Sequence, residues 1–304
     1  IALAGLCIAH THFGLARPTF SRLREYLTYT MPLVPNSSLY RVFDAGDRYV
    51  LSYFTSHAAV GIYAAAYTMG SFFTTLIGPI NMVLLPVMAE FWNQRREAEL
   101  GEYMTQAIRY STLLSLPALA GAIYLAPRLL AMLMADTDQA VPYFRLISCS
   151  FLIFGIGILG SNLLVTAGRT RLLLAVDFTL ATSNLLLNLL FVPAMGIMGA
   201  VVATLMSHIA YATIVLYKAH QIAPFRLPMV PVVHSAVGAG CMIGFLYLTS
   251  ALFGTTLVLQ VGLGAAVYAV FMVASGGIER RELRFFANVV KGLTPERGDD
   301  GDKG

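Results

Sequence analysis

Residues 39–54 read LYRVFDAGDRYVLSYF and place four charges inside a run that is otherwise apolar. The run covers residues 32–55 and is long enough to cross a membrane, because about 20 apolar residues span a hydrocarbon layer of about 30 Å. A charge at the centre of a bilayer costs about 2.5–3.5 kcal/mol, so the charged side of this helix has to face a polar interior. That side carries Arg41, Asp44, Asp47 and Arg48.

The whole chain has the composition of an integral membrane protein. Of its 304 residues, 57% are hydrophobic and 12% are charged, whereas soluble domains average about 25% charged residues. Lys and Arg occur in short gaps between apolar runs, so the formal net charge of +4 indicates membrane topology, and we expect no nucleic-acid partner. The three cysteines are separated in apolar sequence without metal-site spacing, and we expect no cofactor.

Apolar runs predict an all-α fold, a polytopic membrane helical bundle of about eight transmembrane helices. The runs cover residues 32–55, 62–91, 108–134, 143–167, 172–193, 197–217, 230–253 and 256–276. The first six form a predicted transporter lobe over residues 32–217, and the last two form a predicted extension over residues 230–276.

The remaining segments complete the predicted organisation. Residues 1–16 resemble the end of a truncated transmembrane helix, and residues 17–31 form a predicted interfacial linker on the cytoplasmic side. Residues 218–229 form a second cytoplasmic linker. Residues 277–304 form a cytoplasmic amphipathic segment followed by a polar tail that we expect to be disordered.

Polar and small residues within the spans indicate contacts between helices. Asp177, Asn184 and Asn188 lie on one face of the fifth span. The asparagines either bond neighbouring helices or line a polar cavity, and Asp177 is the candidate for binding a coupling H+ or Na+ ion. Small residues at four-residue spacing predict two packing stripes, one at Gly199, Ala203 and Ser207 and one at Gly240 and Gly244.

Two interpretations fit the four charges of the first full span. In one, they form a self-neutralising ladder along the helix, from Arg41 to Asp44 and from Asp44 to Arg48. In the other, Arg41 and Arg48 contact an anionic substrate, while Asp44 and Asp47 hold the guanidinium groups in place.

Three stretches of the chain resemble the second half of a polysaccharide-transporter flippase. They are DAGDRYVLSYFTSHAAVGIYAAAY (residues 44–67), IGPINMVLLPVMAE (77–90) and AGRTRLLLAVDFTLATSNLLLNLLFVPAMGIMGAVVATLMSH (167–208). The family belongs to the multidrug, oligosaccharidyl-lipid and polysaccharide exporter superfamily. The resemblance implies two pseudo-symmetric six-helix lobes around a central cavity, so the chain would correspond to the second lobe and its extension, and the missing N-terminal lobe would be its partner.

The resemblance also implies a function. Related proteins flip undecaprenyl-pyrophosphate-linked oligosaccharides across the bacterial inner membrane for exopolysaccharide, capsule or O-antigen (lipopolysaccharide) synthesis, so we expect a lipid-linked oligosaccharide substrate. Polysaccharide polymerase machinery is a further expected partner, and the C-terminus is expected to be cytoplasmic.

Three alternatives compete with this function. Within the superfamily they are a peptidoglycan lipid-precursor flippase and a cation-coupled multidrug antiporter. The third is a membrane glycosyltransferase or polymerase. The longest predicted outer loop, around Asp136 and Asp138, has no room for a catalytic domain, so we expect no enzyme activity.

The loop charges predict the orientation of the chain. Most of the 20 Lys and Arg residues fall on one side of the membrane, which the positive-inside rule assigns to the cytoplasm. A reporter fused at Asp138 should therefore be external, and one fused at Arg95 or Arg171 should be cytoplasmic. The opposite labelling would reverse every side assignment.

Overall fold

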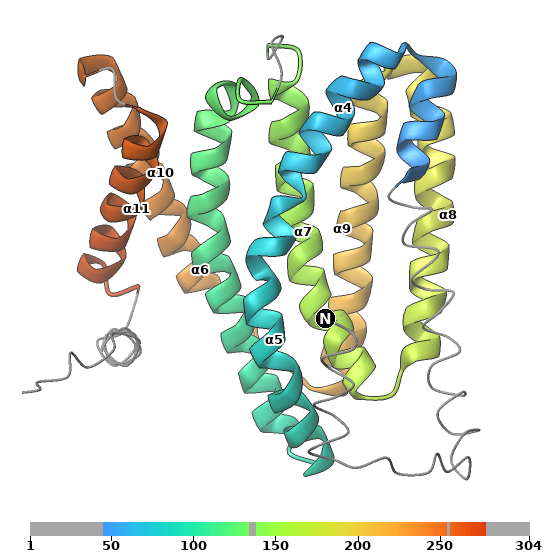
Figure 1. The fold of residues 1–304 in the computed structure, drawn as a ribbon. Helices are drawn as coiled ribbons and strands as arrows, with labels where there is room; N and C mark the ends of the chain where they lie inside the picture. The colour runs from blue at the N-terminus through green and yellow to red at the C-terminus, as the bar shows by residue number, and fades with distance from the viewer. Residues whose placement is uncertain (1–44, 134–137, 254–255, 278–304) are drawn as a thin grey trace, which may run out of the picture.

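The computed structural model describes residues 45–133, 138–253 and 256–277, and these residues form helices joined by short turns (Figure 1). A helix over residues 45–54 precedes the labelled elements. These are α4 (His57–Gly70), α5 (Phe72–Asn93), α6 (Glu97–Leu130), α7 (Val141–Thr166), α8 (Thr170–Met195), α9 (Ile197–Ile222), α10 (Met229–Phe253) and α11 (Leu257–Ala274). The part of the chain that the structure describes contains no strand, and the predicted all-α class is confirmed.

Seven helical segments among the described residues are long and apolar enough to cross a membrane. One of them, His57–Asn93, joins α4 and α5 in a single run of 37 residues. This run rises about 55 Å and therefore extends beyond a hydrocarbon layer of about 30 Å. The prediction of a polytopic helical bundle is confirmed, although the first predicted span is described only from residue 45 onward.

Helix α6 begins earlier than its apolar residues indicate. It runs over 34 residues from Glu97, whereas the predicted span begins at residue 108. The first turn of α6 carries Glu97 and Glu99, and acidic side chains stabilise a helix N-terminus. The turn between α5 and α6 consequently lies beyond the adjacent ends of α7 and α9, at the bottom of Figure 1.

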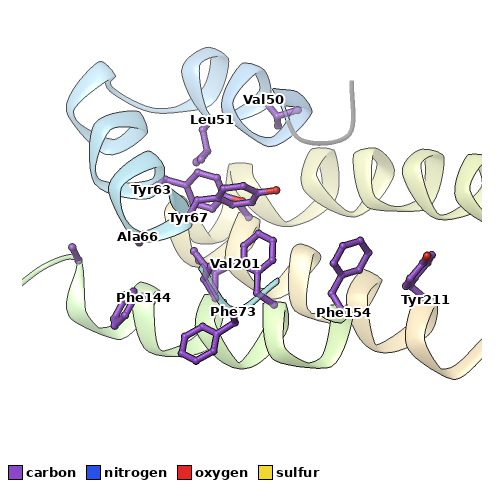
Figure 2. Close-up of a cluster of buried hydrophobic side chains, with 14 of the residues drawn as sticks. Val50, Leu51, Tyr63, Ala66, Tyr67, Phe73, Phe144, Phe154, Val201 and Tyr211 are labelled. Atoms are coloured by element: carbon purple, nitrogen blue, oxygen red, sulfur yellow. The ribbon is translucent and has the colours of Figure 1, made fainter. Parts of the chain in front are cut away.

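The core of the main bundle, residues 45–222, is built around α7. Gly155 of α7 lies against α5, where an added Cβ would come within 2.5 Å of the Ile77 Cδ1 atom. Gly157 lies against α9, where an added Cβ would come within 3.1 Å of the Ala212 Cα atom. Figure 2 shows side chains of this core that come from the first helix, α4, α5, α7 and α9. Small residues on α7 thus allow two neighbouring helices to approach it closely.

Two prolines within α6 determine where other helices dock. A proline has no N–H group, so the carbonyl four residues earlier loses its partner within the helix. Pro117 lies inside α6, and the hydroxyl of Tyr268 in α11 donates to the carbonyl of Leu113 at 2.9 Å. The same hydroxyl lies 2.8 Å from the Ser235 hydroxyl of α10. The carbonyl released by Pro117 therefore anchors the extension, which consists of α10 and α11.

The second proline of α6 anchors α7 in the same way. Pro127 releases the carbonyl of Ile123, and the Arg145 Nε atom of α7 donates to that carbonyl at 3.1 Å. Each contact satisfies a polar group that hydrocarbon could not satisfy.

The first predicted packing stripe is confirmed, whereas the second meets no neighbour among the described residues. At Gly199 an added Cβ would lie 2.5 Å from the Phe191 carbonyl carbon, so α9 packs closely against α8. The connection between these helices is Gly196, whose φ of +57° favours glycine. Built Cβ atoms at Gly240 and Gly244 meet nothing within 4 Å. Their spacing predicted a shared face correctly, but no described helix packs on that face.

The connection between α9 and α10 packs against α6. Ala223 and Phe225 are buried, and the Thr105 hydroxyl accepts a hydrogen bond from the Arg226 N–H at 3.0 Å. At Gly101 of α6, an added Cβ would lie 2.0 Å from the Pro224 carbonyl oxygen. The connection can lie here only because position 101 has no side chain.

Replacing Gly101 with alanine should therefore displace this connection. We expect G101A to lower the free energy of unfolding by about 1–3 kcal/mol, the usual cost of overpacking. Thermal unfolding of the full-length protein in detergent measures the effect. The matched control is G240A, which has room for the methyl group and gains up to about 1 kcal/mol of helix propensity. Equal stability of the two variants would contradict the assigned contact.

Candidate functional site: a buried polar network around Asp47

The carboxylate of Asp47 lies at the centre of a buried polar network. Asp47 is 2% exposed, and its two oxygens accept hydrogen bonds from three neighbouring helices. Asn188 of α8 donates to Oδ1 at 2.7 Å. The hydroxyls of Tyr63 in α4 and Thr204 in α9 donate to Oδ2 at 2.5 Å and 2.9 Å. Neutral groups therefore satisfy a buried charge, which would be costly without them.

A second layer of hydrogen bonds holds the donors of Asp47 in place. The Asn188 amide nitrogen also contacts the backbone carbonyl and side-chain oxygen of Asn184 at 3.0 Å and 3.1 Å. The Asn184 amide donates to the Ser207 hydroxyl at 3.1 Å, and Ser207 donates to the carbonyl of Ala203. Asn184 and Asn188 are both buried, so α8 and α9 are joined by a continuous polar seam that reaches Asp47.

One acceptor in this network is unsatisfied. The side-chain oxygen of Asn188 is buried and has no hydrogen-bond partner. A buried polar atom without a hydrogen-bond partner lowers the free energy of unfolding by about 1–3 kcal/mol. The oxygens of Asp47, Asn184 and Asn188 are hard ligands, the type that hard cations prefer. The described residues hold no cluster of three or more His, Cys, Asp or Glu side chains that could bind a metal. A carboxylate with amide oxygens beside it is a ligand type that suits a proton or a hard cation such as Na+.

Arg48 lies next to Asp47 in sequence but has a different environment. Its side chain is half-buried, and its guanidinium carbon lies 5.0 Å from the centre of the Tyr67 ring, a cation–π distance. Consecutive residues of a helix point about 100° apart, so Asp47 turns into the bundle while Arg48 lies at its edge. The hydrogen bonds to the Asp47 carboxylate come from α4, α8 and α9, and the role that the substrate interpretation gives to Asp47 stays a prediction.

Aromatic contacts extend from Arg48 into the core. The Tyr67 ring meets Phe151 of α7 edge to face at 4.9 Å, and Phe151 lies 5.2 Å from the His208 ring of α9. The Ser150 hydroxyl lies 2.5 Å from His208 Nδ1. Figure 2 labels Tyr63 and Tyr67 beside Leu51 of the first helix. The helix that carries Asp47 and Arg48 thus packs on a layer of aromatic side chains.

The structure brings some of the predicted site residues together and leaves others apart. Asn184 and Asn188 join Asp47. Asp177 is half-buried on the same helix, about 10 Å before Asn184 along the axis, and it lies outside the network. Arg41 and Asp44 lie outside the described residues, so both interpretations of their role stay predictions.

The sequence analysis missed three members of the network. Tyr63 lies in GIYAAAY, where it resembles an ordinary apolar core position. Thr204 and Ser207 lie along the small-residue stripe of α9. Ser207 donates to the carbonyl four residues earlier, and the single proton of the Thr204 hydroxyl is shared between Asp47 and the Ala200 carbonyl. A signal was present, because a buried carboxylate has to find donors and these are the hydroxyls and amides of the neighbouring spans.

Comparisons with known proteins agree with this architecture. A family model described as "Polysaccharide biosynthesis protein" matches residues 3–137. A Haloferax volcanii protein named "Probable flippase AglR" is 24% identical over 206 residues, which cover 64% of this chain and 42% of the relative. The predicted resemblance to polysaccharide flippases is confirmed. The chain spans less than half the length of that relative.

Solved structures of the exporter superfamily share the fold. "Lipid II flippase MurJ, inward closed conformation" aligns with a TM-score of 0.66 at 16% identity, covering 95% of this chain and 60% of that one. An outward-facing multidrug resistance MATE family transporter of the MOP superfamily aligns with a TM-score of 0.50 at 19% identity, covering 86% of this chain and 66% of that one. At these identities the likeness concerns the fold alone.

The hydrogen bond from Thr204 can be tested with a matched pair on α9. The hydroxyls of Thr204 and Thr213 both lie within hydrogen-bond distance of the carbonyl four residues earlier, but only Thr204 also reaches Asp47, and Thr213 is exposed. We expect T204V to lower the free energy of unfolding by about 1–3 kcal/mol, because an oxygen of a buried charge loses a donor. T213V should change it by about 0.5 kcal/mol or less. Thermal or denaturant unfolding in detergent measures both, and equal effects would remove Thr204 from the network.

Proposed function

We propose that the full-length protein flips a lipid-linked oligosaccharide across the cell membrane, and that this chain supplies one of its two lobes and a two-helix extension. The observation that carries the proposal is the charged helix turn at Asp47 and Arg48, which lies within a membrane bundle of the exporter fold. The match to a polysaccharide biosynthesis family and the similarity to a probable flippase support it.

Arg48 suits the binding of a phosphate-bearing carrier. A guanidinium group donates paired hydrogen bonds to phosphate oxygens and stays protonated when it is partly desolvated. The Tyr67 ring fixes its position at the edge of the bundle. We assign Arg48, together with Arg41 if it lies on the same face, to the pyrophosphate or the adjacent sugar. Asp44 then neutralises these arginines when the substrate is absent.

The network around Asp47 suits ion coupling. In this proposal the coupling H+ or Na+ ion binds at Asp47 and Asn188, whose unsatisfied oxygen provides a ready ligand. Asn184 supports the site through Asn188. Asp177, which lies outside the network near the predicted cytoplasmic end of α8, is a secondary candidate for binding the coupling ion. Binding and release of the cation along its gradient would shift the equilibrium between the inward-facing and outward-facing arrangements of the two lobes.

A second candidate function is cation-coupled export of a drug or metabolite. The oxygen-rich network and the fold shared with a multidrug transporter support it. The flippase is preferred because an antiporter for apolar or cationic compounds gives no reason for an arginine at the bundle edge. A peptidoglycan lipid-precursor flippase is the alternative that shares this mechanism. The proposal also includes three finer assignments, which are the bacterial inner membrane, an undecaprenyl-pyrophosphate carrier and a polysaccharide polymerase as partner.

Transport by the full-length protein tests both roles in one assay. Inverted membrane vesicles would be supplied with the lipid-linked oligosaccharide, and its movement to the lumenal face would be followed with and without an imposed H+ or Na+ gradient. We expect R48K to lower transport at least tenfold under every condition, because paired hydrogen bonds to phosphate are lost. D47N should retain a slow rate that no longer responds to the gradient.

The matched control is R171K, which changes an exposed arginine at the start of α8 and should leave transport unchanged. Protein levels in the vesicles would be equalised, so that poor insertion is not read as lost transport. Wild-type transport by R48K would reject the role of the arginine, and gradient-dependent transport by D47N would reject the coupling site. Absence of any oligosaccharide movement in wild-type vesicles would favour the antiporter.

A further inference from the structure

The extension meets α6 through polar groups at one end of the bundle. The Arg128 Nη1 atom of α6 donates to the Gln260 Oε1 atom of α11 at 2.6 Å. One turn earlier on α6, the Tyr124 hydroxyl lies 2.8 Å from the Ser250 hydroxyl of α10. This is the membrane face at which α6 ends and α11 begins, and the loop charges predict it to be external.

Gln260 carries an unsatisfied donor at this point. The residue is 0% exposed, and its Nε2 atom is buried without a hydrogen-bond acceptor. The orientation of the amide follows from its neighbour, because Arg128 can only donate and therefore fixes the oxygen on its own side. Each buried N–H group without an acceptor lowers the stability of the fold by about as much as the loss of one hydrogen bond. This arrangement calls for an acceptor that approaches Nε2.

The N-terminus of α11 lies at the same place. Gln260 is in the first turn of this 18-residue helix, and side chains in a helix lean toward its N-terminus. The preceding residue Thr256 makes no side-chain cap bond, so the first N–H groups have no side-chain acceptor from their own cap. Free N–H groups and the helix dipole attract anions at such an end.

The first turn of α11 also carries exposed apolar residues on the faces that point away from Gln260. Val258, Leu259 and Val261 are exposed by 82%, 50% and 54%, so in a bilayer we expect acyl chains beside the first turn of α11. A soluble anion would have to approach across this apolar rim. A phosphate that is attached to hydrocarbon chains fits both the donors and the rim.

We infer that the Arg128–Gln260 junction and the first turn of α11 form a binding site for the phosphate of a membrane lipid. Arg128 supplies charge, and Gln260 Nε2 and the first N–H groups of α11 supply neutral donors. The ligand is either the phosphate of a bulk phospholipid or that of a polyprenyl carrier, since both offer the same acceptor oxygens. The inference does not depend on the proposed flippase activity, because it concerns the seam between α6 and the extension.

Ligand-induced stabilisation of the purified full-length protein tests the site. The protein in a non-ionic detergent would be titrated with phosphatidylglycerol, and its unfolding temperature would be recorded. Binding to the folded state raises this temperature. We expect a saturable rise for the wild type and an apparent affinity at least tenfold weaker for Q260L and for R128Q. Q260L removes both the unsatisfied Nε2 donor and the oxygen that accepts from Arg128, so the lipid-free unfolding temperature of each variant is the baseline for its own titration.

The controls separate the ligand chemistries. Diacylglycerol has the same chains without phosphate, and inorganic phosphate has no chains, so neither should reproduce the rise. A rise with polyprenyl phosphate alone assigns the site to the carrier, and a rise with both lipids assigns it to phosphate headgroups in general. Q221L changes an exposed glutamine at the other end of the bundle and should bind like the wild type. An unchanged affinity of both Q260L and R128Q, or an equal rise with diacylglycerol, would overturn the inference.

Discussion

The burial of the Asp47 carboxylate constrains the whole main bundle. A charge that is 2% exposed in a membrane protein has to be surrounded by donors, because neither lipid nor bulk water can supply them. Its three donors come from α4, α8 and α9, so these helices have to present Tyr63, Asn188 and Thr204 at the same depth. Their rotations about their own axes are fixed together, and the close approach of α8 to α9 at Gly199 makes that geometry accessible.

The same requirement explains how the extension is attached. Prolines in α6 release two backbone carbonyls, and each accepts a side-chain hydrogen bond from another helix, from Tyr268 or from Arg145. In water such carbonyls could bond solvent, but in hydrocarbon each needs a partner from the protein. Apolar packing alone would allow the helices to slide past one another, since lipid chains are as apolar as leucine. Polar contacts at defined depths therefore set the vertical register of α7 and α11.

The spans and the polar face of α8 could be predicted from the sequence, whereas the contacts between helices could not, for physical reasons. Hydropathy located the spans, because the length of an apolar run can be read directly along the sequence. It missed the start of α6 at Glu97, since a helix continues into water wherever its residues favour helix. The polar face of α8 was visible from the spacing of Asn184 and Asn188, but their partner Asp47 was not, because periodicity does not reveal which faces of two helices meet. The same limit explains why Gly240 and Gly244 share a face that packs against nothing described.

The separation of Asp47 from Arg48 gives the proposed function a physical basis for coupling. Hydroxyl and amide groups supply the hydrogen bonds to Asp47, so its carboxylate does not depend on the adjacent arginine for donors. A cation that binds at Asp47 changes the net charge of this helix turn from zero to positive, while Arg48 lies one residue away at the bundle edge. Unit charges 4 Å apart interact by about 4 kcal/mol at an effective dielectric constant of about 20, and the energy falls inversely with distance. Cation binding would then favour an anionic substrate beside Arg48, and by linkage the substrate would favour the cation to the same extent. Two neighbouring residues that point in different directions can therefore connect an ion inside the lobe to a lipid phosphate outside it.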